Sequence, residues 1–210
     1  MPIPPAGNLI ARVSAPGAFG VEIEDCGQAV PVHPDEDIWV AGSIPARRRE
    51  FAWGRFCARA ALMQMGIGET AIARGPDGAP IWPAGIVGSI THTVGYAAAI
   101  VGSRSDFLGI GVDAERIGGV TEHLYPKLFD SQERALLATL DEERRRLIST
   151  IFFSAKEAYF KAWWPANGKP LSFQNIHVVL EGDGFRANQD QGQVAISDGL
   201  VVTAVALAAR

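Results

Sequence analysis

The sequence predicts an α+β protein, because two kinds of hydrophobic pattern follow one another along the chain. Residues 43–65 and 142–164 carry apolar side chains at the spacing of a helix with one buried face. The apolar runs at 96–101 and 200–209 are too short to span a bilayer and are typical of buried strands. The 210 residues are 48% hydrophobic and 20% charged, an ordinary balance for a globular protein with a substantial core.

The first long helix is expected to begin at Ser43 and to continue to about Met65. Serine is a common residue at the start of a helix, and Pro45 suits the first turn. Gly66 or Gly68 then ends the helix.

Arginines gather on one side of this helix. Arg48, Arg55 and Arg59 lie within about a quarter turn of one another at helical spacing, and Arg47 lies beside them. Such a stripe is often a solvated face, but arginine is also the usual forked partner of phosphate groups. The residues alone leave both interpretations open, for these four side chains and for Arg49.

A segment rich in glycine and proline at 74–80 is expected to be a surface turn. It leads to a short strand at 86–90 and then to two longer strands joined by a turn at 103–106. This turn is the candidate boundary between an N-terminal half, 1–104, and a C-terminal half, 105–210.

Two mostly helical segments follow, at 124–140 and 142–164. Acidic residues in their first turns suit the N-terminal ends of helices, and Pro165 is expected to end the second segment.

Further strands are expected near the C-terminus. Apolar residues alternate at 176–180, a turn follows at 182–184, and 200–207 forms the last strand. Residues 185–199 are mostly polar and carry no clear pattern, so the sequence does not assign them.

Charge and cysteine content exclude several classes of protein. The formal net charge of −4, with no block of like charges, gives no reason to expect a nucleic-acid partner. The two cysteines, Cys26 and Cys57, cannot form a disulfide framework. Residues 1–5 lack the basic flank and apolar run of a signal peptide. We therefore expect a cytoplasmic protein that binds neither nucleic acid nor a membrane.

Two carboxylates stand at the end of the strand expected at 107–112. In an extended chain alternate side chains share a face, so Asp113 and Glu115 point the same way and Ala114 points to the other side. Magnesium prefers oxygen ligands and usually takes only a few carboxylates from a protein. The pair would suit a cation, although a strand that ends in solvent would show the same residues.

The segment 153–161 places charges of both signs on a predicted helix. Glu157 and Lys161 are four residues apart and share one helical face, and Lys156 lies beside them. Glu157 would supply a third carboxylate for a cation, and the two lysines would supply positive charge for phosphate oxygens. Ordinary surface ion pairs on a helix look the same, so neither segment is specific alone.

Together, in this order and at this separation, the two segments resemble the signature of the 4'-phosphopantetheinyl transferases. The likeness is to the surfactin-type group, and in particular to its enterobactin-synthetase component D-like branch. It extends over about residues 43–173 in five blocks, namely 47–59, 78–83, 88–92, 111–115 and 153–161. Members of this family move 4'-phosphopantetheine from coenzyme A to a serine of an apo carrier protein and release adenosine 3',5'-bisphosphate.

The resemblance implies two similar α+β halves related by a pseudo-twofold axis, with coenzyme A bound between them. It implies Mg²⁺, which Mn²⁺ would replace, bound by Asp113, Glu115 and Glu157. Catalytic roles are implied for Glu157, Lys161 and Asp113. Contacts to coenzyme A are implied for Arg47, Arg55, Arg74, Thr91, His92, Lys156 and Lys161. More distant members carry a lysine where this chain has Ala79, and Arg74 is the basic residue that matches.

The implied partners are apo acyl or peptidyl carrier protein domains, modified by a monomeric enzyme. The motifs do not distinguish carriers of fatty-acid, polyketide, nonribosomal peptide or siderophore synthesis. Two other classes stay open. A regulator that binds coenzyme A or a nucleotide would share the arginines and metal carboxylates without turnover. A metal-dependent phosphohydrolase would cleave coenzyme A and leave the carrier unmodified.

Overall fold

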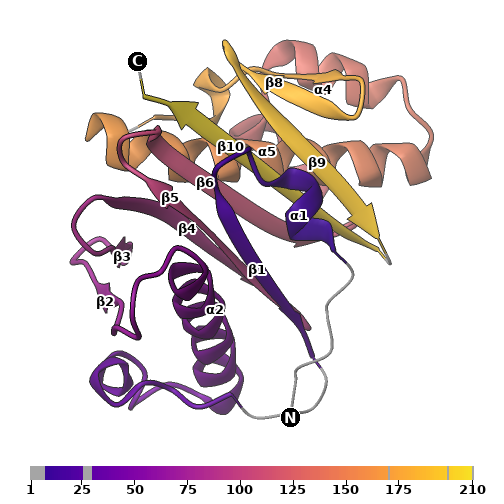
Figure 1. Cartoon of the computed structure of the whole chain (residues 1–210). Coiled ribbons are helices and arrows are strands. Elements are labelled where there is room, and N and C mark those ends of the chain that lie inside the picture. The colour runs from indigo at the N-terminus through magenta and orange to yellow at the C-terminus, as the bar shows by residue number, and fades with distance from the viewer. Residues whose placement is uncertain (1–7, 26–29, 170, 198, 210) are drawn as a thin grey trace.

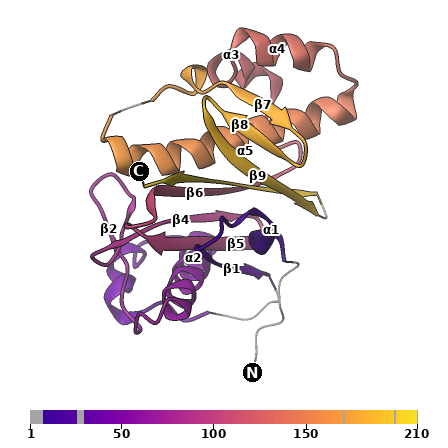
Figure 2. The ribbon, with the colours of Figure 1, turned by 45° about the horizontal axis from the view of Figure 1, so that its top comes forward.

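Two antiparallel sheets form the centre of the chain, and a long helix covers the outer face of each (Figures 1 and 2). The structure is a computed structural model that describes residues 8–25, 30–169, 171–197 and 199–209. From one side to the other, the layers are helix, sheet, sheet and helix. The α+β class expected from the sequence is confirmed.

The first sheet has three strands in the order β1-β5-β4. The strands are β1 (Phe19–Glu24), β4 (Ile86–Thr93) and β5 (Tyr96–Ser103). Helix α2, Pro45–Gln64, packs on β5 and buries Leu62 against Ala97 and Ala99 in a core of its own. The helix begins close to the expected residue, but Ile44 and not Ser43 is its N-cap, with Pro45 in the first turn.

Short elements complete this half of the chain. They are α1 (Leu9–Val13), η1 (Pro34–Trp39), β2 (Ala73–Arg74) and β3 (Pro80–Ile81). Strands β2 and β3 pair on either side of the expected glycine-rich turn. Both lie beyond the end of α2, at the edge of the molecule (Figure 1).

The second sheet has five strands in the order β6-β10-β9-β8-β7. The strands are β6 (Phe107–Arg116), β7 (Val178–Glu181), β8 (Gly184–Ala187), β9 (Asp190–Ser197) and β10 (Leu200–Ala208). The helical elements are α3 (Tyr125–Leu128), α4 (Ser131–Ala138) and α5 (Glu142–Asn167), with the 3₁₀ turns η2 (Glu122–Leu124) and η3 (Phe173–Asn175). Helix α5 packs along β6 and β10, much as α2 packs on the first sheet.

A shared core joins the two sheets. Strand β4 lies alongside β6, and Ile100, Val112 and Val202 are buried together between the sheets. The chain passes from one sheet to the other at the turn 103–106. Helix α1 crosses this division, because it packs on β9 of the second sheet. The division into 1–104 and 105–210 therefore stays a prediction.

Helix α5 does not end at Pro165, so that expectation was wrong. The helix continues to Asn167 and is closed by Gly168 in the left-handed conformation, whose N–H donates to the Trp164 carbonyl. Proline in the last turn removes only the hydrogen bond that its own N–H would have made to Lys161.

Most of the unassigned segment 185–199 forms strands β8 and β9. Its polar residues lie on the outer face, where Gln191 and Gln193 are exposed. Gly192 lies under the ring of Phe185, since an added Cβ would be 2.2 Å from Phe185 Cζ. One face of this strand is solvated, and on the other face a glycine takes the place of an apolar side chain. The segment therefore lacks the alternation of apolar residues that would predict a strand.

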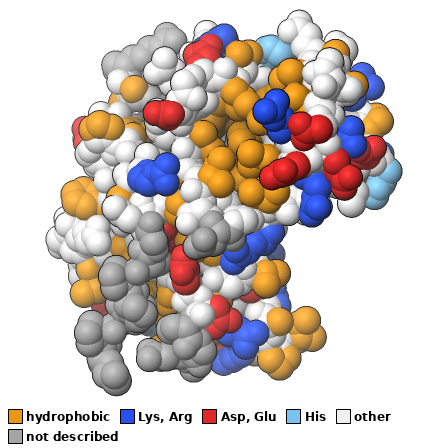
Figure 3. Space-filling model, turned by 90° about the vertical axis from the view of Figure 1, so that its right-hand side faces the viewer, with side chains coloured by type: hydrophobic (Ala, Val, Ile, Leu, Met, Phe, Trp, Pro, Cys, Tyr) orange, Lys and Arg blue, Asp and Glu red, His pale blue; other side chains and the backbone are white. Residues whose placement is uncertain are grey.

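The surface carries charges of both signs. Acidic and basic side chains lie among one another on the face shown in Figure 3, next to an area of hydrophobic side chains. Among the described residues, no helix combines the length and the apolar character that crossing a membrane requires. Cys57 is buried, and Cys26 lies outside the described residues.

Strand β6 and helix α5 approach one another closely. A Cβ added at Gly111 would lie 1.8 Å from the Ala158 carbonyl oxygen, and one at Gly109 would lie 2.2 Å from that of Ala162. No larger side chain fits at either position without moving the helix. The two glycines therefore set the distance between the strand that carries Asp113 and the helix that carries Glu157.

We predict that Gly111→Ala destabilises the protein by at least about 3 kcal/mol, because the new methyl group meets helix backbone that cannot turn away. Chemical denaturation would measure the loss. Gly68→Ala is the matched control, since a Cβ there meets nothing within 4 Å. Equal stability of the two variants would contradict the close contact.

Candidate functional site

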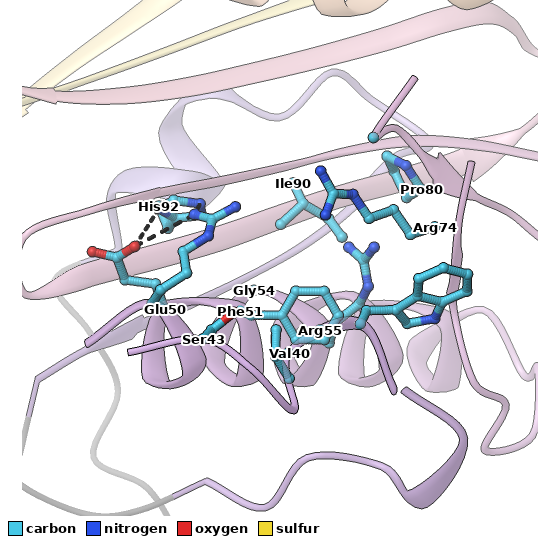
Figure 4. A pocket seen from close by; sticks show the side chains of 13 residues that line it. Val40, Ser43, Glu50, Phe51, Gly54, Arg55, Arg74, Pro80, Ile90 and His92 are labelled. Atoms are coloured by element: carbon cyan, nitrogen blue, oxygen red, sulfur yellow. Dashed lines mark hydrogen bonds and ion pairs between the residues drawn. The ribbon is translucent and has the colours of Figure 1, made fainter. Parts of the chain in front are cut away.

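Basic side chains from separate elements line one pocket (Figure 4). Arg47 and Arg55 come from α2, Arg74 from β2 and His92 from β4. The cavity has a volume of about 170 Å³. Its apolar lining includes Trp39, Val40, Phe51, Pro80 and Ile90. The structure thus brings together four residues that the sequence predicts as coenzyme A contacts.

Arg47, Glu50 and His92 form a small network at one end of the pocket. Figure 4 labels Glu50 and His92 there. Arg47 Nη1 lies 2.8 Å from His92 Nε2 and 3.4 Å from Glu50 Oε2. A guanidinium can only donate, so His92 Nε2 accepts and the ring proton lies on Nδ1, which faces Glu50 at 3.6 Å. Burial and the nearby Arg47 charge lower the pKa of His92, which agrees with a neutral ring.

Arg55 is held at the floor of the pocket. Its Nε donates to the Ile72 carbonyl at 3.1 Å, and the guanidinium carbon lies 4.8 Å from the centre of the Phe51 ring. The side chain is nearly buried, and burial together with the charges of Arg74, Arg59 and Arg47 lowers its pKa to about 10. Arg55 is still charged at neutral pH, in a pocket where positive charges outnumber negative ones. An anion would relieve that imbalance.

The other arginines of α2 have partners away from the pocket. Arg48 is paired with Asp37, and Arg59 with the buried Glu36. The Arg49 guanidinium lies 6.0 Å from the centre of the Trp53 ring. The stripe of Arg48, Arg55 and Arg59 therefore divides, and only Arg55 lines the cavity.

Strand β6 and helix α5 bring charged groups together beside this pocket. Lys161 Nζ lies 2.7 Å from Asp113 Oδ1 and 3.2 Å from the Val112 carbonyl oxygen. Glu115 and Glu157 both act electrostatically on Lys161. The two charged segments predicted from the sequence thus lie together, with Asp113 and Glu115 on the strand and Glu157 and Lys161 on the helix.

Thr91 belongs to this cluster and does not line the arginine pocket. Its predicted contact with coenzyme A stays a prediction. The side chain is buried, with 3% of its surface exposed. Its Oγ1 accepts from the Ala114 N–H at 3.0 Å and lies 3.4 Å from Asp113 Oδ1. Thr91 therefore holds β6 to β4 and orients Asp113.

The carboxylates repel one another. Burial, followed by the charge of Asp113 and opposed by Lys161, raises the pKa of Glu115 to about 7. The pKa of Glu157 is also raised, first by burial and then by Asp113. Burial works against the Lys161 ammonium, but Asp113, Glu157 and Glu115 together raise its pKa.

A divalent cation fits this chemistry. Asp113 Oδ2 is a buried oxygen for which the described residues provide no hydrogen-bond partner. One ammonium group faces three carboxylates, which leaves negative charge that hard cations with oxygen ligands prefer. The donor set of Asp113, Glu115 and Glu157 therefore suits Mg²⁺.

A tighter group of possible metal ligands lies elsewhere. Among the described residues, the possible ligand atoms of Asp130, Glu133 and His177 all lie within 4.8 Å of one another. The carboxylates of Asp113, Glu115 and Glu157 do not meet this limit. These groups already have partners in the protein, because His177 Nδ1 lies 2.6 Å from Asp130 Oδ2 and Glu133 accepts from Val178 N. The group holds the start of α4 to the start of β7.

Lys156 completes that group and does not line the arginine pocket. Its predicted contact with coenzyme A stays a prediction. The side chain is fully buried, and its ammonium lies 2.6 Å from Glu133 Oε2. It also donates to the Leu128 and Phe173 carbonyls at 3.0 and 2.8 Å. Lys156 precedes Glu157 and lies about 100° from it around α5, on the side that faces Glu133.

A larger hollow, of about 800 Å³, lies beside the arginine pocket. It shares Gly78, Pro80 and Ile90 with the arginine pocket and reaches Lys161 on α5. Its wall includes Trp82, Phe160 and Trp164, so it is mostly apolar. The two adjoining hollows form the cleft, with the arginines in one part and Lys161, beside Asp113, in the other.

Sequence reasoning missed Glu50 and the walls of the cleft. Glu50 is three residues after Arg47 on α2, and this spacing is the only signal in the sequence that joins them. Trp39 and Trp164 come from segments far apart in the chain, and nothing local indicates that they line the same cleft.

Comparison with known proteins assigns the family. Residues 34–102 match the model of the 4'-phosphopantetheinyl transferase N-terminal domain, and residues 109–205 match that of the 4'-phosphopantetheinyl transferase superfamily. The chain is 36% identical over 184 residues to 4'-phosphopantetheinyl transferase Npt of Nocardia iowensis, which covers 88% of this chain and 82% of that protein. The chain belongs to the 4'-phosphopantetheinyl transferase family.

Two further relatives agree with this assignment. 4'-Phosphopantetheinyl transferase Svp of Streptomyces mobaraensis is 37% identical over 193 residues, 84% of this chain and 78% of Svp. Enterobactin synthase component D of Salmonella typhimurium is 36% identical over 122 residues, 56% of this chain and 48% of that protein. The resemblance inferred from the motifs is therefore confirmed, including its enterobactin component D-like branch.

We predict that Lys156→Met destabilises the protein by about 3 to 5 kcal/mol, because it leaves the Glu133 carboxylate buried without its cation. Lys127→Met is the matched control, since Lys127 is exposed on α3. Denaturant unfolding of both variants would measure this. An Lys156 variant as stable as the control would show that the buried pair does not hold this region.

A second prediction concerns pH. The raised pKa of Glu115 means that stability falls as pH rises from about 4.5 to about 7 and is then constant, because ionisation becomes costly only in the folded state. Glu115→Gln removes this loss. In the presence of a chelator, the melting temperature of the variant minus that of the wild type should be larger at pH 8 than at pH 5. The same difference at both pH values would contradict the raised pKa.

Proposed function

We propose that this transferase binds coenzyme A along the two adjoining hollows of the cleft and transfers 4'-phosphopantetheine from it to a serine of an apo acyl or peptidyl carrier protein. The observation that carries the proposal is the position of Gly78, Pro80, Ile90 and Lys161. The first three line both hollows, and Lys161 joins the larger hollow to the carboxylates. Coenzyme A has the matching charges, a phosphomonoester on its ribose and a pyrophosphate several bonds away.

The arginine pocket would hold the 3'-phosphate. A phosphomonoester carries close to two negative charges at neutral pH, and forked guanidinium groups match its oxygens. Arg47, Arg55 and Arg74 surround the cavity, and His92 is held beside them by Arg47. The apolar walls leave room for the rest of the nucleotide, and the larger hollow leaves room for the pantetheine arm.

Asp113, Glu115 and Glu157 would hold Mg²⁺, and Mn²⁺ would serve in its place. The bound cation would neutralise charge on the pyrophosphate oxygens. The unpartnered Asp113 Oδ2 and the raised pKa of Glu115 support this assignment. Thr91 and Lys161 would keep Asp113 in place for it.

Glu157 would act as the general base. Its carboxylate takes the proton of the carrier serine, directly or through a water, as the serine oxygen forms a bond to the β-phosphorus. The bond from that phosphorus to the bridging oxygen breaks, and adenosine 3',5'-bisphosphate leaves. The raised pKa of Glu157 favours proton uptake near neutral pH. Lys161 supplies positive charge to the leaving phosphate, and Asp113 orients the lysine.

The location and assembly of the enzyme remain predictions. We propose a monomer that acts in the cytoplasm. The carrier class is open among fatty-acid, polyketide, nonribosomal peptide and siderophore synthesis.

The direct test is the intact mass of a panel of apo carrier proteins after incubation with coenzyme A, Mg²⁺ and this protein. Transfer adds the mass of phosphopantetheine to the carrier. A binding protein would leave both coenzyme A and the carrier unchanged, and a phosphohydrolase would consume coenzyme A without adding mass.

Glu157→Gln should lower the single-turnover rate of transfer by roughly 10² to 10⁴, because the amide keeps the shape of the side chain but accepts no proton. Calorimetry should still show binding of coenzyme A. Wild-type rates in this variant would assign the base to water or to another carboxylate.

Lys161→Met should lower the transfer rate far more than the affinity for coenzyme A, because the variant keeps most of the side-chain length and loses the charge. Rates and dissociation constants measured on the same preparation would show this. A loss confined to affinity would make Lys161 a binding residue only.

A further inference from the structure

A buried carboxylate lies behind the arginine pocket. Glu36 belongs to η1, and its surface is 0% exposed. One of its oxygens accepts from the Ile72 N–H at 2.9 Å, and the other is paired with Arg59 of α2. Glu36 therefore joins η1, the segment before β2, and α2.

Ile72 carries this connection to the pocket. Its N–H donates to Glu36, and its carbonyl accepts from Arg55 Nε at 3.1 Å. Two residues further on is Arg74, which lines the cavity. In Figure 4 the guanidinium groups of Arg55 and Arg74 extend into the same space. The position of Ile72 thus affects both arginines.

Glu36 also balances charge. Arg55 and Arg59 are four residues apart on α2, with 6% and 8% of their surfaces exposed. Two guanidinium groups buried this closely repel one another. Glu36 is the nearby carboxylate that favours the charged form of Arg55, against burial and the charges of Arg74, Arg59 and Arg47.

The end of η1 adds a third link. Trp39 and Val40, which follow Glu36, also line the pocket. A carboxylate that fixes η1 therefore fixes this wall as well. Asp37, the next residue, instead pairs with Arg48 on the surface, and both its side chain and that of Arg48 are more than 40% exposed.

We propose that Glu36 is a positioning residue for the phosphate pocket, which holds Arg55 and Arg74 in place through Ile72 and Arg59 and so sets the preference for a nucleotide with a phosphomonoester. This inference rests on the proposed function of the pocket. Glu36 does not touch the ligand. A role confined to holding the fold together would affect all ligands of the cleft equally.

The test compares coenzyme A with dephospho-coenzyme A, which lacks the 3'-phosphate, by calorimetry. The wild type should bind coenzyme A more tightly. Glu36→Gln should weaken coenzyme A binding roughly tenfold or more, the value of a charge-assisted hydrogen bond, and should leave dephospho-coenzyme A binding nearly unchanged. Asp37→Asn, the matched control, should keep the wild-type ratio of the two affinities.

A second variant keeps the test decisive if Glu36→Gln alone does not fold. Glu36→Gln combined with Arg59→Gln removes both charges of the buried pair, so that no buried charge lacks its partner. The ratio of affinities should fall in this variant as well. A wild-type ratio in the folded single or double variant would overturn the role of Glu36.

The same measurements distinguish an error in the proposed phosphate pocket from an error in the role of Glu36. If the wild type binds both ligands equally and Arg55→Ala changes neither affinity, the proposed phosphate pocket is wrong. If the wild type prefers coenzyme A, Arg55→Ala removes the preference and the Glu36 variants keep it, only the inference about Glu36 is wrong.

Discussion

The close approach of β6 to α5 determines the geometry of this site. Gly109 and Gly111 let the strand lie against the helix carbonyls of Ala158 and Ala162. Asp113 follows two residues after Gly111 on the same strand face. On the helix, Glu157 and Lys161 lie within a turn of those carbonyls. A bulkier strand residue would separate the two charged segments, so the two glycines are part of the site although they carry no reactive group.

The site keeps opposite kinds of charge in separate places. Arginines of α2 and β2 gather at one end of the cleft, and carboxylates of β6 and α5 at the other. Each group holds mostly one sign of charge, and burial, followed by nearby like charges, lowers the pKa of Arg55 and raises that of Glu115. A ligand with a terminal phosphate, together with a cation, would relieve both imbalances. The electrostatic cost of crowding like charges in the fold thus favours the complex.

The sequence predicts what is local or belongs to a family motif. The helical spacing of 142–164, the shared face of Asp113 and Glu115, and the collection of Arg47, Arg55, Arg74 and His92 all follow from such patterns. The buried ion pair of Lys156 shows what such patterns do not predict. Its partner Glu133 lies 23 residues earlier, and no local pattern distinguishes this lysine from Lys161.

Long-range packing explains the other differences. Thr91 contacts Asp113 because β4 and β6 lie side by side, which the motif around Thr91 does not encode. Strand β9 has few apolar residues because one of its faces is solvated and Gly192 makes room for Phe185. Glu36 carried no signal, since a single acidic residue in a polar segment is normally exposed.

The most direct measurement is a crystal structure of the protein with coenzyme A and Mg²⁺. The account predicts the 3'-phosphate within hydrogen-bond distance of the guanidinium groups of Arg55 and Arg74, and the pyrophosphate between Lys161 and the carboxylates of β6 and α5. Coenzyme A bound outside the cleft, or with its 3'-phosphate away from these arginines, would contradict it.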